Sequence, residues 1–215
     1  MERFWRINRT LVQKLQDTHY YINDTEKKAA ADLHAFEATF PNRDSMERIF
    51  TPLPNTVAAT RTPNGVLVCF AELVEDKKYI RVDDVRRLIM KMQDTGVTAA
   101  FFILNAALSS KGLDMLRSAQ APDTLRVVVF ETRELMFNVT KHSRVPRHEL
   151  LSSSQAHEWL VSSKLKRSQL PRVFESDPQC KYYDALSGDI IRVTRPSPTC
   201  GVFVHNVLVV RKLGK

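Results

Sequence analysis

The sequence predicts an α/β (α+β) protein of two domains, a mixed-sheet domain at residues 1–142 and a small α+β domain at residues 143–215. Three observations support this prediction. Strand-like and helical hydrophobic periods alternate from residue 66 to residue 130, which is typical of an α/β layer. A polar, basic, proline-containing stretch follows at residues 141–148, as is common between domains. Beyond it, a helical pattern precedes two strand patterns.

The first 41 residues predict two helices. Apolar side chains recur at three- and four-residue spacing at Phe4, Ile7, Leu11 and Leu15. The helix is rich in arginine, but the chain continues into tyrosines and a second helix, so a packed helix is favoured over a membrane-surface one. Asn23, three residues before Glu26, resembles a capping arrangement, and Pro41 ends the second helix.

The next section predicts extended structure. RIFTPL (48–53) and TVAAT (56–60) are short extended candidates, and VLVCFAEL (66–73) follows a turn at Pro63-Asn64-Gly65. Asn-Gly between two extended runs is a hairpin signal. The sequence therefore predicts antiparallel pairing across this turn.

Residues 82–139 return to alternating periods. A helix from Val82 ends at Gly96, and a second spans residues 110–120. The apolar runs TAAFFIL (98–104) and LRVVVF (125–130) predict buried strands, and a short helix follows. Right-handed crossovers would make these strands parallel, so that the hairpin adds antiparallel pairing to a mixed sheet.

The last third begins with a helix capped by the serines at 152–154. A polar, proline-containing segment, QLPRVFESDPQCKYY (169–183), separates it from the strands IIRVTRPS (190–197) and VFVHNVLVV (202–210). A unit of about 73 residues has a small core, and we expect it to gain stability by docking onto a partner.

Charge and composition limit the classes of partner and of protein that the sequence suggests. The net charge is +8, and residues 143–215 carry 12 Lys/Arg against 6 Asp/Glu. Such a basic portion is suited to contact with nucleic acid or with an acidic protein surface. The alternative is a basic face that is solvated and has no partner. No apolar run is long enough for a membrane span, and the charged N-terminus does not resemble a secretory signal. Cys69, Cys180 and Cys200 are scattered, which favours reduced structural thiols in an intracellular protein.

Signs of catalysis are few. With 6 glycines there is no phosphate-binding loop, and the six histidines are dispersed. We found neither a nucleophile elbow nor a metal-ligand spacing, so no cofactor, metal or small-molecule substrate is expected. One alternative is a metal-dependent nuclease, in which Glu131 and the upstream Asp83-Asp84 would hold the cation. However, Arg133 stands where such a site needs lysine, and Glu131 can simply begin a helix.

The C-terminal third carries a specific signature. It consists of Gln169-Leu170-Pro171-Arg172, Asp177-Pro178, Tyr182, residues 190–193, Arg195-Pro196-Ser197, Thr199 and Gly201. In order and spacing it resembles a small archaeal RNA polymerase subunit, the module that forms the C-terminal half of the fifth common subunit of eukaryotic nuclear RNA polymerases. Phe4-Trp5-Arg6, Tyr20-Tyr21-Ile22 and residues 97–148 resemble the remainder of that eukaryotic subunit.

The resemblance implies a non-catalytic polymerase subunit of two domains. Residues 1–142 would form a restriction-endonuclease-like jaw domain beside downstream duplex DNA. Residues 143–215 would anchor it to the largest subunit, among the other polymerase subunits. The signature residues would then be partner-binding residues, with the proline-stiffened segment losing little entropy on docking. The alternative is that this segment only braces its own domain.

In the jaw domain the resemblance places a loop near DNA, here with Ser109, Ser110 and Lys111. Hydroxyls and one lysine suit phosphate contact without base reading, whereas a helix cap explains either serine equally well. With a net charge of +2 over residues 1–142, any such contact would be weak and salt-sensitive.

The chain also departs from the family pattern in the small domain. Residues 184–189 lack the usual Gly-Leu step and basic residue, and Pro198 replaces an acidic residue. Val202-Phe203 replaces Arg-Tyr, and His205-Asn206 stands where an aromatic-Arg pair is common. We therefore expect a diverged paralogue in one nuclear polymerase class, with RNA polymerase I favoured, and a nuclear, in that case nucleolar, location. A free-standing basic nucleic-acid-binding protein is a further alternative.

Overall fold

The computed structural model describes residues 2–71, 79–120, 125–199 and 201–211. The chain divides into two compact units, Met1–Phe137 and Asn138–Lys215. The division precedes the expected one between residues 142 and 143, because Asn138 donates a hydrogen bond to the Tyr182 hydroxyl at 2.9 Å. Within the described ranges, no helix is both long and apolar enough to cross a membrane.

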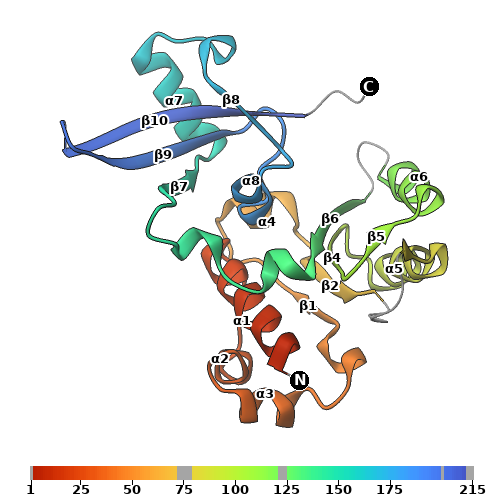
Figure 1. The fold of residues 1–215 in the computed structure, drawn as a ribbon. Coiled ribbons are helices and arrows are strands. Elements are labelled where there is room, and N and C mark those ends of the chain that lie inside the picture. Colours follow the sequence, from red (N-terminus) through yellow and green to blue (C-terminus); the bar gives the residue numbers. More distant parts are fainter. Residues whose placement is uncertain (1, 72–78, 121–124, 200, 212–215) are drawn as a thin grey trace. The chain divides into compact units, whose positions relative to one another are not determined.

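The N-terminal unit begins with three helices (Figure 1). They are α1 (Glu2–Asp17), α2 (Asp24–Ala31) and α3 (Leu33–Thr39). The predicted cap of α2 is confirmed, since the Asn23 side chain accepts a hydrogen bond from Glu26 N at 2.8 Å. The expected single second helix is wrong. Asp32 is extended and caps α3 by accepting from Ala35 N, so the helix restarts there.

A four-stranded mixed sheet follows, in the order β1-β2-β4-β6. Its strands are β1 (Arg48–Phe50), β2 (Val66–Phe70), β4 (Ala99–Leu104) and β6 (Arg126–Glu131). The pairs β2–β4 and β4–β6 are parallel, and β1–β2 is antiparallel. The expected mixed α/β layer is confirmed.

Two cores cover the two faces of this sheet. Side chains at alternate β2 positions, Val66, Val68 and Phe70, join a cluster that includes α1 and α3. Leu67 and Cys69 join the other, which includes α5 (Val82–Thr95) and α6 (Ser110–Ala119). Burial on both faces explains why these strands read as continuous apolar runs. Helix α5 ends at Gly96 in the left-handed region, as expected.

The segment TVAAT is not extended as expected but forms helix α4 (Val57–Arg61). The Thr56 hydroxyl accepts a hydrogen bond from Ala59 N at 3.2 Å and so caps the helix. The antiparallel partner of β2 is therefore β1, and the Asn64-Gly65 turn joins a helix to a strand. Local strand propensity was outweighed by the cap.

The remaining elements of this unit are short. They are the 3₁₀ helices η1 (Arg43–Met46) and η2 (Thr132–Leu135) and the parallel pair β3 (Tyr79–Ile80) and β5 (Ala107–Leu108). Arg3 of α1 donates to the Thr132 hydroxyl at 2.9 Å and ties η2 to the first helix. The α1 side chain Lys14 is fully buried, with Nζ 3.9 Å from the centre of the Phe101 ring.

The C-terminal unit has its own four-stranded sheet, in the order β7-β9-β10-β8. Its elements are η3 (Val139–Lys141), β7 (Arg147–Leu150), α7 (Ser153–Ser163), η4 (Arg167–Gln169), β8 (Arg172–Phe174), α8 (Pro178–Tyr182), β9 (Ile190–Ser197) and β10 (Gly201–Val210). In this sheet the β8–β10 pair is parallel and the other two pairs are antiparallel. Ser152 caps α7, and Gly188, with φ of +97°, turns the chain into β9.

This sheet also carries a small core on each face. One cluster joins Ile191 and Val193 of β9 to Cys180 of α8. The other joins Ile190 of β9 to Leu151 and to Ala156 of α7. Helices thus cover both faces of the inner part of β9 and β10.

Candidate partner-binding surface

The signature segment at residues 169–183 is largely folded into its own unit. Leu170 is 6% exposed and belongs to the core cluster with α7. Tyr182 is buried, accepts a hydrogen bond from Asn138 and contacts the Tyr183 ring edge-on. Asp177 caps α8 by accepting from Gln179 N at 2.9 Å, and Pro178 is the first residue of that helix. The local reason for this irregular fold is therefore helix capping and core contact.

Other signature residues in the segment form hydrogen bonds with the backbone of their own unit or face outward. Gln169 accepts a hydrogen bond from Lys166 N at 2.8 Å, and the Pro171 carbonyl accepts from Leu208 N at 2.8 Å. Arg172 and Phe174 are exposed on β8, an edge strand. Arg172 forms no ion pair with any residue that the structure describes. It is thus the side chain of this segment that is free to reach a carboxylate.

Leu170→Ala is expected to lower the free energy of unfolding of the C-terminal unit by about 2–5 kcal/mol, because it empties a core position. Arg172→Ala, the matched control, should change it by less than about 0.5 kcal/mol. Urea unfolding followed by Trp159 fluorescence in a Trp5→Phe background measures both, since Trp159 packs beside the same core. Equal effects of the two substitutions would contradict the placement of Leu170.

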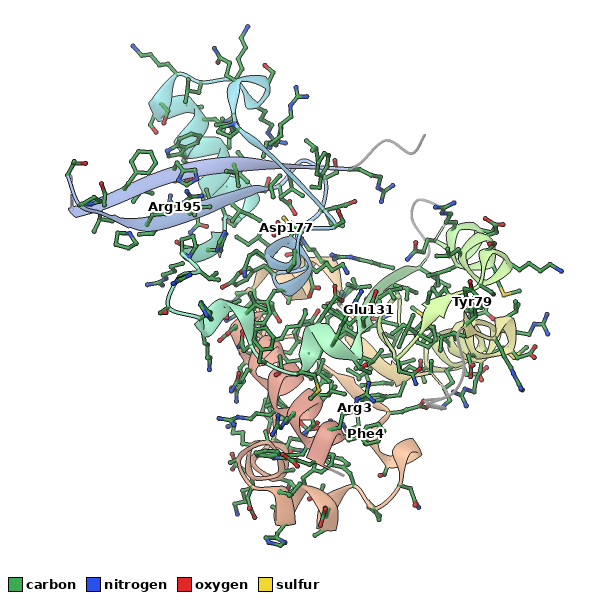
Figure 2. The ribbon with its side chains drawn as sticks, in the orientation of Figure 1. Arg3, Phe4, Tyr79, Glu131, Asp177 and Arg195 are labelled. Atoms are coloured by element: carbon green, nitrogen blue, oxygen red, sulfur yellow. The ribbon has the colours of Figure 1, made fainter. Side chains whose placement is uncertain are left out.

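The other signature residues lie on and beside the β9–β10 hairpin. Arg195, Pro196 and Ser197 end β9, the Ser197 and Thr199 hydroxyls are 3.2 Å apart, and Gly201 begins β10 with φ of +72°. Figure 2 shows Arg195 on the hairpin and Asp177 beside α8. The signature therefore combines internal contacts in residues 169–183 with exposed positions on the hairpin.

Three exposed apolar residues of the hairpin were missed from the sequence. Val202 is 61% exposed, and Phe203 and Val204 are each 51% exposed. The Phe203 ring stacks on His205, with centroids 5.4 Å apart. Consecutive apolar residues in a strand are typical of a buried strand, so no local signal predicted their exposure. We call residues 194–197 and 201–205 the hairpin end.

Two histidines, one in the hairpin end and one in β7, lie in one row across the sheet. His148 of β7 and His205 of β10 are both register partners of Val193 of β9. Burial lowers the pKa of His148, and the neighbouring Arg195 adds to this, whereas a hydrogen bond with the Pro146 carbonyl and the charge of Asp177 oppose it. Burial and then Arg195 lower the pKa of His205. Arg195, the register partner of Phe203, lies next to this row on the same face of the hairpin.

The loop expected near DNA is held by a helix cap. The Ser109 hydroxyl accepts a hydrogen bond from Gly112 N at 3.2 Å and begins α6. Ser110 is the first residue of the helix, and Lys111 is exposed. Of the two serines weighed as caps, the structure assigns that role to Ser109. Lys111 is left as the side chain suited to a phosphate.

The residues considered for a nuclease contact arginines. Glu131 ends β6, as Figure 2 shows, and its carboxylate lies 2.5 Å from Arg133 Nε. Asp83 and Asp84 lie 3.4 and 3.5 Å from Arg86 and Arg87. Among the residues described, no three His, Cys, Asp or Glu side chains gather so that they could hold a metal.

The described cysteines are buried and unpaired by disulfides. Cys69 donates to Glu47 at 3.2 Å, and burial raises its pKa to about 12. Burial also raises the pKa of Cys180 to about 12. Neither thiol is a nucleophile at neutral pH. Cys200 lies outside the described residues.

Residues 137–208 match the family model of RNA polymerase Rpb5, C-terminal domain. The match begins one residue before the C-terminal unit and ends inside β10. This part of the chain is therefore similar to the C-terminal domain of Rpb5. Similarity to RNA polymerase subunits extends across nearly the whole chain, which is 29% identical to "DNA-directed RNA polymerases I, II, and III subunit RPABC1" of Caenorhabditis briggsae over 209 residues. That alignment covers 97% of this chain and 96% of the relative.

Two further relatives carry the same description. The Caenorhabditis elegans protein is 28% identical over 97% of this chain and 96% of its own length. The Dictyostelium discoideum protein is 25% identical over 95% of each. All the signature residues from Gln169 to Gly201 lie inside the segment that matches the Rpb5 C-terminal domain.

Proposed function

We propose that this chain is a non-catalytic subunit of a nuclear DNA-directed RNA polymerase, held in the enzyme by contact of its C-terminal unit with the largest subunit. The observation that carries the proposal is the nearly full-length similarity to polymerase subunits in nematodes and in Dictyostelium. A role as a subunit also accounts for arginines that have no ion-pair partner within the described chain.

The proposed anchoring residues are the exposed part of the signature. Arg172 on β8 and Arg195 on β9 carry guanidinium groups without an ion pair to the described residues, and Pro196 stiffens the strand beside Arg195. Leu170, Asp177, Pro178 and Tyr182 support the surface by fixing η4, β8 and α8 from within. Guanidinium groups bind carboxylates through paired hydrogen bonds, so we expect acidic residues on the largest subunit.

We propose a jaw role for the N-terminal unit, with Lys111 facing the phosphates of downstream duplex DNA in the assembled enzyme. The support is the exposed position of Lys111 at the start of α6, where backbone N–H groups also favour anions. A single lysine in a domain of low net charge predicts weak binding that depends on the assembly. Lys111→Glu should therefore leave subunit recovery unchanged while lowering DNA retention by the purified polymerase.

We further propose that the chain serves one polymerase class, with RNA polymerase I favoured and a nucleolar location expected. The support is that the departures at Val202-Phe203 and His205-Asn206 lie on or beside the exposed hairpin end. The described relatives are subunits of polymerases I, II and III. Recovery of this chain with all three nuclear polymerases would overturn the class preference and leave the subunit role intact.

Affinity purification of the tagged full chain from its own cells tests the subunit role. We expect both large polymerase subunits in stoichiometric amounts, as measured by quantitative mass spectrometry. Arg172→Glu with Arg195→Glu should lower their recovery, whereas Lys166→Glu, an exposed cation on the α7–β8 connection, should not. A chain that purifies alone, or with nucleic acid alone, would contradict the proposal.

A further inference from the structure

We infer that the hairpin end binds an acidic, apolar segment of the partner chain, with side chains of that segment lying against both faces of the hairpin. The inference rests on the proposed function, and it names the chemistry of the anchoring contact. Four observations on the hairpin end support it: exposed apolar residues, the register of β9 and β10, two buried polar atoms without hydrogen-bond partners, and a positive charge.

The register places different chemistry on the two faces. Directly paired residues of antiparallel strands share a face. Phe203 pairs with Arg195 and lies on the face of His205, and Val202 pairs with Pro196 on the opposite face. Val204, paired with Thr194, extends this second, apolar face. One face therefore offers an aromatic ring beside a guanidinium, and the other offers mainly aliphatic groups.

The inner part of the same two strands is covered, whereas the outer part is not. Ile191 and Val193 lie in the core cluster with α8, and Ile190 lies in the cluster with α7. Beyond them, three consecutive residues of β10 are more than half exposed. In Figure 1 the outer ends of β9 and β10 extend past α7 at the left. Single exposed apolar residues are common, but a contiguous group on a projecting hairpin indicates a contact surface.

Two polar atoms at the base of the hairpin end lack partners among the described residues. Asn206 is 5% exposed, and its Oδ1 accepts no hydrogen bond there; Nδ1 of His205 is also shielded and unpaired. The two side chains point to opposite faces because they are consecutive in a strand. A buried polar atom without a hydrogen-bond partner destabilises the free chain, so a bound chain that supplies hydrogen bonds would stabilise both faces.

The positive charge of the hairpin end favours an acidic segment as its binding partner. From Ile190 onward the sequence contains no aspartate or glutamate. Arg192 is neutralised by Glu149 at 3.7 Å, but Arg195 forms no ion pair with the described residues. A carboxylate beside an apolar side chain would satisfy Arg195 and cover Phe203. Nucleic acid fits less well, because Val202, Val204 and Pro196 offer nothing to phosphates.

Substitution in the assembled enzyme gives the first test. Phe203→Glu in the tagged full chain should lower recovery of the largest subunit about tenfold or more, as for a central interface residue. The matched control is Val161→Glu on α7, since Val161 is 64% exposed and lies outside the hairpin. Trp159 fluorescence during urea unfolding verifies that both variants fold. Equal recovery with wild type, Phe203→Glu and Val161→Glu would overturn the inference.

A photo-crosslinking residue at position 202 gives the second test and does not depend on a destabilising substitution. The crosslinked peptide should carry Asp or Glu next to large apolar residues. A basic peptide, nucleic acid, or a second copy of this chain at that position would overturn the inference. Failure of the proposed function can be distinguished from failure of this inference, because the wild-type chain would then recover no polymerase subunit at all.

Discussion

Arg48→Met is expected to lower the free energy of unfolding of the N-terminal unit by about 3–5 kcal/mol at pH 7, the usual effect of breaking a buried ion pair. Arg48 lies 3.1 Å from the Glu26 carboxylate and donates to Asn8 Oδ1 at 2.6 Å. Its guanidinium also lies 4.2 Å from the centre of the Phe40 ring. The substitution leaves the Glu26 carboxylate buried without its cation.

The direction of the pKa shifts indicates how the pair contributes. Burial raises the pKa of Glu26, although the charge of Arg48 acts against it. Burial likewise lowers the pKa of Arg48, against the attraction of Glu26. Desolvation is the largest cause in both cases, so the loss in Arg48→Met arises mainly from the stranded carboxylate. Glu26→Gln in the Arg48→Met background should therefore restore part of the lost stability.

The same argument predicts a pH dependence. Without Arg48, two influences that lower the pKa of Glu26 disappear, so its folded-state pKa rises further above the unfolded value. A raised pKa means that the folded state binds the proton more tightly, so stability increases as pH falls. The deficit of Arg48→Met relative to wild type should shrink between pH 7 and pH 5, and Glu26→Gln should abolish this dependence.

Urea unfolding of the full chain measures these values, with Trp5 fluorescence as the probe in a Trp159→Phe background. Trp5 packs against the core of the N-terminal unit, so it reports on that unit. Arg86→Met is the control, because the Arg86 side chain is 55% exposed and pairs with exposed Asp83. A loss below about 1 kcal/mol for Arg48→Met would mean that the pair is not a stabilising element.

Gly65→Ala is expected to cost the N-terminal unit about 3 kcal/mol or more, since it combines backbone strain with a clash. Gly65 has φ of +91°, and a Cβ there would lie 2.6 Å from the Phe50 carbonyl oxygen. That oxygen belongs to the backbone of β1, whose Phe50 is the register partner of Val66 in β2. The methyl group would push the two strands apart.

Gly96→Ala separates the two causes of this loss. Gly96 has φ of +66°, but nothing lies within 4 Å of the position that a Cβ would take. Only the left-handed conformation then costs energy, about 1–2 kcal/mol. The two variants are compared by the same Trp5 unfolding curves. Equal losses would show that β1 moves away from the added methyl group without cost.

The sequence by itself determined the elements whose signals are local. The caps at Asn23 and Ser152, the end of α5 at Gly96, and the buried strands β4 and β6 were all predictable from caps, glycine and hydrophobic period. The signature at residues 169–201 also predicted the similarity to the C-terminal domain of RNA polymerase Rpb5. Such features depend on side chains within a few residues of one another, so the linear order contains them.

Only the tertiary structure decided which of these residues are buried. Leu170 and Tyr182 face inward, whereas Val202, Phe203 and Val204 face outward from strands of similar apolar character. Residues 57–61 form a helix, and β2 pairs with β1 across it. Burial and pairing depend on which distant segment arrives alongside, and the helices α7 and α8 cover only the inner part of the hairpin. That incomplete cover is the physical reason why the hairpin end is exposed.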